Sequence, residues 1–411
     1  MHHRFANTED TTLKEEKMNQ TVKPISTFTI LAMAFFGMGV GTITPALNAI
    51  FVQFSDLPIT TLLLVSTLPS LTVIPATLIA GSVAGSKVKY RTLAIIGMTL
   101  FVLGGVAPYF ATDFTVILLE RAIFGIGLGI MSPLANSLVM GVYEGDKVAS
   151  MTGMVTLAMN IGGMVLQFMG GYFAGIGWNY SFLPHALGII SLLMVIFFLP
   201  EPPKAPVTAE TQAAPKEKLP VKLFIIVLVY GLYTLSIYPM LVNMSTLIVD
   251  RGLGTTATAG IVLALLTIGG MVAGSVFGKV FKMSGRFIMA LGYALATIGL
   301  VMVVFASNIA LLTVGVFIEG FAMSTLIPAS MMLISMTVKP SQMALGVSFF
   351  MAGMNLFGFL STYWIGAIAA VTGDAVTAPI AVGACVTAAF FVVYLIVNPL
   401  KSSAPVAPER G

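Results

Sequence analysis

Apolar runs of about 20 residues or more follow one another along almost the whole chain. One helical crossing of a bilayer core needs about 20 apolar residues. Only 9% of the 411 residues are charged, against roughly 25% in soluble domains. The sequence therefore predicts an all-α membrane protein with twelve transmembrane helices, at 26–53, 59–84, 92–110, 114–142, 148–174, 180–199, 223–249, 256–280, 287–306, 309–338, 343–371 and 378–399.

Basic residues are distributed unevenly between the two sides of these helices. If both termini are cytoplasmic, 18 of the 20 Lys and Arg residues fall on the cytoplasmic side, in agreement with the positive-inside rule. Arg251 lies in an outer loop and Arg121 within a helix. Asp113 and Asn308 interrupt long apolar stretches, where we expect tight turns. The predicted location is the inner (plasma) membrane of a bacterium, with many crossings and both termini cytoplasmic.

A proline-rich segment divides the chain into nearly equal parts. Residues 200–220 contain six prolines and several charges, which cannot pack a core. We expect a cytoplasmic tail at 1–25, a six-helix bundle at 26–199, a linker at 200–222, a second bundle at 223–399 and a cytoplasmic tail at 400–411. The residues before Met18 are mostly polar, and Lys14 to Glu16 can be encoded by a ribosome-binding sequence, so Met18 is the expected native start.

The two predicted bundles repeat one another at an offset of 193 to 195 residues. The segment at 81–85 matches 274–278, and Pro45 matches Pro239. Gly125 and Pro133 match Gly320 and Pro328. A nearly constant offset across several helix pairs predicts a parallel repeat of six plus six helices.

Three local patterns give the chain a resemblance to the major facilitator superfamily. They are the loop GSVAGSKVKYR at 81–91, the motif RxxxGxGxG that begins at Arg121, and GWNYSF at 177–182. The resemblance implies a secondary transporter that works by alternating access. It also implies gating loops between helices 2 and 3 and between helices 8 and 9, with candidate residues Gly81, Gly85, Lys87, Arg91, Gly274, Gly278, Lys279 and Arg286.

The chain departs from the family pattern at two places. Gly85 and Gly278 stand where the family has an Asp that is thought to brace the two halves. The fifth helix keeps Gly170 and Gly171 but lacks the Gly-Pro that precedes them in many antiporters, which counts against drug/proton exchange.

Few ionisable residues lie within the predicted helices, where each costs about 2.5–3.5 kcal/mol on insertion scales. Arg121 and Glu319 lie on helices 4 and 10, which line the cavity in the family fold. At the repeat offset Arg121 corresponds to Val316, and Glu319 lies on the same helical face as Val316. We expect Arg121 and Glu319 to face one cavity and bind substrate or a proton; a structural ion pair is the alternative.

Other polar side chains are weaker candidates. Asn48, Tyr233, Tyr238 and Asn243, on helices 1 and 7, fit a small-molecule site, although such residues also make structural hydrogen bonds. Four further residues carry less weight. Glu120 points away from the face of Arg121, and His185 lies on helix 6, which usually faces lipid in this fold. Asn160 and Asn355 are repeat mates on helices 5 and 11.

The motif content argues against an enzyme. The sequence has no phosphate loop, no Cys or His spacing for a metal site and no nucleophile–base pair, so we expect no metal and no cofactor. The expected partners are a small-molecule substrate, membrane lipid and protons, without nucleic acid, and the expected state is a monomer. The preferred function is export or exchange of a small organic compound, coupled to protons through Glu319. There are two alternatives. The protein takes up an organic anion that binds at Arg121, or it is a substrate sensor built on a transporter scaffold.

Overall fold

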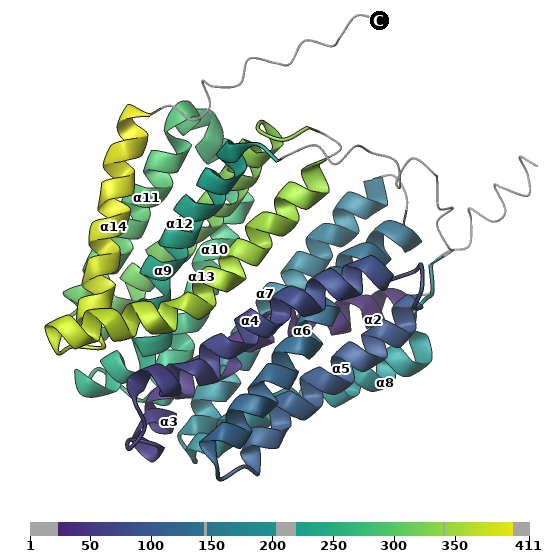
Figure 1. Cartoon of the computed structure of the whole chain (residues 1–411), viewed down its shortest axis with the longest axis horizontal. Helices are drawn as coiled ribbons and strands as arrows, with labels where there is room; N and C mark the ends of the chain where they lie inside the picture. The colour runs from purple at the N-terminus through teal and green to yellow at the C-terminus, as the bar shows by residue number, and fades with distance from the viewer. Residues whose placement is uncertain (1–23, 144–145, 203–218, 340–341, 398–411) are drawn as a thin grey trace, which may run out of the picture.

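The computed structural model describes residues 24–143, 146–202, 219–339 and 342–397, and helices dominate this part of the chain (Figure 1). The first half contains α2 (Pro24–Ala34), η1 (Phe35–Ala46), α3 (Leu47–Gln53), α4 (Ile59–Val83), α5 (Tyr90–Val106), η2 (Ala107–Tyr109), α6 (Phe114–Val142), α7 (Asp146–Ala174), η3 (Trp178–Leu187) and α8 (Gly188–Phe198). The second half contains α9 (Val221–Asp250), α10 (Thr256–Ser284), η5 (Gly285–Phe287), α11 (Ile288–Val304), α12 (Ile309–Ser335), α13 (Met343–Thr372) and α14 (Thr377–Ile396).

The described helices are long and apolar enough to cross a membrane many times. Eleven such spans occur in the described ranges, and the span Thr256–Val304 contains two helices, α10 and α11. Counted separately, these two helices bring the total to twelve, which confirms the predicted fold class. The predicted start at Met18 and most of the predicted linker lie outside the described residues.

The two turns predicted from isolated polar residues are confirmed, and each residue caps the helix that follows. Asp113 Oδ1 accepts hydrogen bonds from the backbone N–H of Thr115 (2.7 Å) and Val116 (3.2 Å). Asn308 Oδ1 accepts one from Leu311 N (2.9 Å). These bonds satisfy backbone donors at the N-termini of α6 and α12 that would otherwise lack partners.

The helices form two bundles, each with its own apolar core. One core cluster runs from Ile30 to Leu199 and a second from Leu223 to Ala384. The bundles lie side by side (Figure 1). We call the end where α8 ends and α9 begins the linker end, and the opposite end, where α6 and α12 begin, the far end.

The bundles contact each other near the far end. A third apolar cluster there combines Leu47 and Ile50 of α3 with Val242 of α9 and Ile365 of α13. The hydroxyls of Thr67 and Thr362, one from each bundle, are buried and 2.5 Å apart. These contacts close the far end between the bundles.

Several glycines near the linker end have open space around them. A Cβ atom added at Gly81, Gly153, Gly274 or Gly278 would meet no described atom within 4 Å. These four glycines lie near the linker ends of α4, α7 and α10, on both bundles. All four glycines are exposed, whereas the contacts between the bundles described above close the far end.

Arg251 and Asp374 hold the second bundle together at its far end. The Arg251 guanidinium donates hydrogen bonds to the carbonyl oxygens of Val303 and Ala306 (both 3.1 Å) and lies 3.3 Å from the Thr377 hydroxyl. Asp374 accepts hydrogen bonds from the first backbone N–H groups of α14, at 2.8–3.0 Å. Burial alone would raise the pKa of Asp374, but these N–H groups and Arg251 outweigh it, so the pKa lies below its usual value of 3.8.

Replacing the Asp374 cap is expected to destabilise the protein in a pH-dependent way. A lowered pKa in the folded state means that the carboxylate stabilises the fold above its usual pKa, and that this contribution disappears as the pH falls through the folded value. Loss of such a cap costs about 1 kcal/mol. The thermal unfolding midpoint of Asp374→Ala in detergent should lie below wild type at neutral pH, and the difference should shrink at an acidic pH below the usual Asp value of 3.8. An Asp56→Ala variant, in an exposed loop, is the control; an equal deficit at both pH values would contradict the cap.

Candidate functional site

Arg121 is the largest fully buried side chain of the first bundle. Its Nε donates a hydrogen bond to the Val65 carbonyl oxygen of α4 (2.9 Å), and its Cζ lies 4.2 Å from the centroid of the Phe124 ring. Pro69 explains why that carbonyl is available, because a proline lacks the N–H that would bond the carbonyl four residues earlier in the helix. Nη1 and Nη2 have no hydrogen-bond partner in the described part of the chain. The guanidinium therefore keeps two free donor groups inside the bundle.

His185 also lies inside the first bundle, so the expectation that it faces lipid is wrong. Its side chain is fully buried, and its ring packs on Phe124 and Phe101 at 5.0 Å and 5.6 Å between centroids. His185 Nδ1 lies 2.8 Å from the Phe182 carbonyl oxygen. The cause is the 3₁₀ helix η3, whose 3.0 residues per turn shift the register that an α-helix would give.

Glu319 is fully buried in the second bundle. Its Oε1 accepts a hydrogen bond from the Tyr233 hydroxyl of α9 (2.8 Å), and its Oε2 has no partner among the described residues. Gly299 of α11 makes room for the carboxyl, because a Cβ at that position would lie 3.1 Å from Oε2. Glu319 therefore points into its own bundle, between α9 and α11.

The structure does not bring Arg121 and Glu319 together. The contacts described for Arg121 come from the first bundle and those for Glu319 from the second. Both side chains are closed off from solvent in this conformation. That they face a common cavity at another stage of transport stays a prediction.

The remaining candidates lie at several depths. Tyr238 of α9 hydrogen-bonds Ser70 of α4 and so joins the two bundles. Asn243 donates to the Ala375 carbonyl (2.8 Å), and Asn355 donates to a carbonyl of its own helix. The last three candidates, Asn48, Glu120 and Asn160, are half-buried, and no side-chain hydrogen bond is described for them.

The two candidate gating loops lie at the linker end. Gly85 has φ +71°, a left-handed conformation that favours glycine, and a Cβ there would collide with the Tyr90 ring. Lys87 is exposed, and the Arg91 guanidinium donates to the Ile196 carbonyl of α8. In the second bundle Gly274, Gly278 and Lys279 are exposed, and the Arg286 guanidinium lies 4.4 Å from the Phe287 ring centroid.

Glu201 is a residue that sequence reasoning assigned only to the linker. Its carboxylate accepts hydrogen bonds from Tyr90 N (2.8 Å) and Arg91 N (3.0 Å), and so caps the N-terminus of α5. The available signal was an acidic residue directly after the sixth helix, on the same side as the basic loop at 87–91. The cap ties the end of α8 to the start of α5.

Comparison with known proteins supports the fold. The Quinolone resistance protein NorA of Staphylococcus aureus (strain MRSA252) is 25% identical over 161 residues, which cover 37% of this chain and 42% of NorA. The uncharacterized MFS-type transporter YcnB of Bacillus subtilis (strain 168) is 30% identical over 112 residues, 26% of this chain and 23% of YcnB. The match thus spans less than half of either relative.

Solved structures with low sequence identity share the fold. The nucleoside transporter NupG superposes with a TM-score of 0.75 at 13% identity, and the match covers 90% of this chain and 98% of the NupG chain. A bacterial homologue of the lysosomal transporter Spinster, in an inward-facing and unoccupied conformation, has a TM-score of 0.69 at 16% identity, with 94% and 100% covered. At these identities the likeness shows the fold alone.

The sequence model of the Major Facilitator Superfamily matches residues 29–309 of this chain. This range takes in most of the first bundle, the linker and helices α9 to α11. The matched region is more than half of the chain, and the twelve helices are arranged as in the solved transporters. The chain therefore belongs to the major facilitator superfamily and is a multi-pass secondary transporter of the membrane rather than an enzyme.

Proposed function

We propose that this protein exports or exchanges a small organic compound against protons and that Glu319 carries the proton. The supporting observation is a fully buried carboxyl whose one described partner is the Tyr233 hydroxyl. An ionised carboxylate in the membrane interior is costly, whereas a protonated one is neutral, and the Tyr233 hydroxyl can donate to the ionised form. Such a group can take up a proton in one conformation and release it in another.

Alternating access supplies the two conformations. We infer that the linker end faces the cytoplasm, because the Lys and Arg residues gather at that end, so that the described conformation is closed on the outer side. Rocking of the bundles would then open the contact of Thr67 with Thr362 and bring the bundles together at the linker end. The likeness to NorA, which is named for quinolone resistance, favours export. A single chain contains both bundles and the proposed proton carrier, so we propose that the protein works as a monomer.

Uptake of an organic anion is a second candidate, favoured by a different observation. Arg121 has two guanidinium nitrogens without described hydrogen-bond partners, and such a fork binds carboxylates through two parallel bonds. An anion that entered the first bundle would satisfy both nitrogens. The direction of proton movement relative to substrate distinguishes uptake from export.

Glu319→Gln is expected to abolish proton-driven accumulation in proteoliposomes and to retain substrate exchange. Glutamine keeps the size and the hydrogen bond to Tyr233 but carries no proton, and exchange requires no net proton movement. The substrate is a compound that raises the unfolding temperature of the purified protein in a library screen. Glu120→Gln is the comparison variant. Wild-type accumulation in Glu319→Gln with loss in Glu120→Gln would move the proton carrier to the first bundle.

A further inference from the structure

Glu319 is closed off from solvent. It has no exposed surface, and Tyr233, which donates to it, is buried together with Tyr230 and Tyr293, whose rings pack on Tyr233. If Glu319 carries the proton, as proposed above, the proton reaches it through the protein. The aromatic hydroxyls around it are the groups available to pass that proton on.

A row of three tyrosines leads away from Glu319. Tyr233, which donates to Glu319, lies 5.9 Å between ring centroids from Tyr293 of α11. Tyr293 stacks on Tyr394 of α14, with centroids 5.4 Å apart and ring planes 8° apart. We call Tyr233, Tyr293 and Tyr394 the tyrosine row. It connects three helices of the second bundle.

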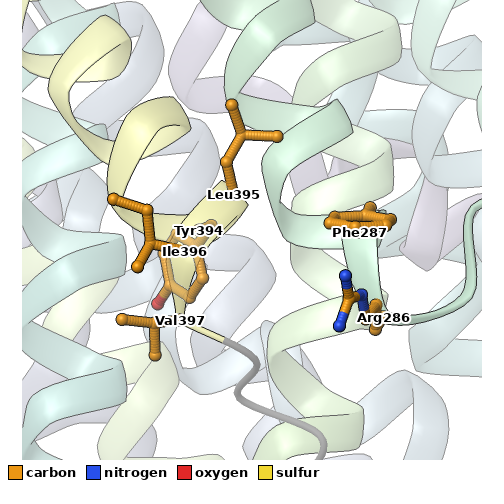
Figure 2. A pocket seen from close by; sticks show the side chains of 6 residues that line it. All are labelled: Arg286, Phe287, Tyr394, Leu395, Ile396 and Val397. Atoms are coloured by element: carbon orange, nitrogen blue, oxygen red, sulfur yellow. The ribbon is translucent and has the colours of Figure 1, made fainter.

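The row ends at a surface pocket. Tyr394 lines a shallow surface pocket together with Arg286 and Phe287 of η5 and residues 395–397 at the end of α14 (Figure 2). Tyr293 lies six residues before Gly299, about 9 Å nearer the linker end at 1.5 Å per residue. Because Gly299 touches Glu319, the row runs from the carboxyl toward the linker-end surface.

Two polar atoms along the row lack partners. Tyr293 Oη and Glu319 Oε2 are both buried and have no hydrogen-bond partner in the described ranges. Buried hydroxyls and carboxyls are almost always hydrogen-bonded, to protein or to water. A water molecule with two polar partners can bridge such groups and transfer a proton between them.

We propose that the tyrosine row is the proton route between Glu319 and the linker-end surface, with the pocket at Tyr394 as its mouth and bridging water between the hydroxyls. Each hydroxyl accepts one proton on one side and releases one on the other, so that each tyrosine is unchanged apart from the direction of its O–H bond. The net change is one proton lost by water at the pocket and one gained by the Glu319 carboxylate. Protons and substrate then use separate openings at the linker end, and Arg286 is the charged group at the proton mouth.

The experiment follows the protonation of Glu319 directly, without any substrate. After a pH jump, time-resolved infrared spectroscopy of the purified full chain records the carboxyl C=O band that Glu319→Gln removes. Tyr293→Phe and Tyr394→Phe each delete one hydroxyl and keep the ring. We expect each to slow the rise of the band by about tenfold or more, since a positioned proton-transfer group contributes about 100-fold or more. The final amplitude of the band should remain unchanged.

Tyr230→Phe is the matched control. Tyr230 is buried, lies 5.4 Å from Tyr233 between ring centroids and packs on Phe350 of α13, and it belongs to the same tyrosine group beside Glu319 but does not line the pocket. It should keep the wild-type rate, and equal slowing in Tyr230→Phe would overturn the route. A band that rises at the wild-type rate in Tyr293→Phe would also overturn the route but leave Glu319 as the carrier. Absence of any band that Glu319→Gln removes would contradict the proposed function itself.

Discussion

Oxidation of a Thr67→Cys/Thr362→Cys pair is expected to stop transport completely, and reduction is expected to restore it. The two hydroxyl oxygens are 2.5 Å apart and come from different bundles. Paired cysteines need Cβ atoms about 3.5–4.5 Å apart, which a hydroxyl–hydroxyl contact of this length allows. A disulfide at this position would hold the far end closed and exclude the outward-facing conformation.

The chain allows a clean test of this crosslink. Cys385 is its one cysteine, it is exposed on α14, and Cys385→Ser removes it. The matched control is a Thr297→Cys/Thr387→Cys pair, whose hydroxyls are 3.0 Å apart within the second bundle. That disulfide should leave transport intact. Full transport by a Thr67→Cys/Thr362→Cys protein that mass spectrometry shows to be fully crosslinked would rule out opening at the far end.

Loss of the Arg121 guanidinium is expected to abolish substrate binding without unfolding the first bundle. Arg121→Met keeps most of the side-chain volume and removes the buried charge, which costs about 2.5–3.5 kcal/mol on insertion scales. Replacement of buried charges by apolar groups is often neutral or stabilising. Arg121→Met should therefore unfold at or above the wild-type temperature and show no shift with a substrate that stabilises wild type.

Two further variants separate charge from geometry at this position. Arg121→Lys keeps the charge but not the planar fork, and we expect it to restore little binding. Pro69→Ala returns a backbone N–H that competes with Arg121 Nε for the Val65 carbonyl, and we expect it to weaken binding while Arg121 is still present. Wild-type binding by Arg121→Met, measured as the thermal shift, would assign Arg121 to structure alone.

Helix positions followed well from the sequence, but side-chain directions did not. The span 114–142 agrees with α6 residue for residue, because Asp113 supplies both the break and the cap. The repeat offset related Arg121 to Val316, and both residues are fully buried. It could not show how each helix is rotated against its neighbours. That rotation depends on contacts such as the space that Gly299 leaves for the Glu319 carboxyl.

Two other features depended on information that periodicity does not carry. His185 was expected to face lipid on the basis of the usual place of the sixth helix, but the 3₁₀ geometry of η3 turns it inward. Glu201 belongs to a proline-rich segment that predicts no packing, and its hydrogen bonds to the start of α5 span more than 100 residues of sequence. Long-range caps of this kind depend on which helix ends meet in space.

The Glu201 cap also determines which contacts bear a pulling force on the linker when the bundles move apart. Tension along the linker acts first on the two hydrogen bonds to α5, so that α8 is shielded from it. Between Pro202 and Leu219 the covalent chain can span at most about 55–60 Å, at about 3.3–3.6 Å per residue. The covalent connection therefore sets only a wide upper limit on how far the end of the first bundle can move from the start of the second.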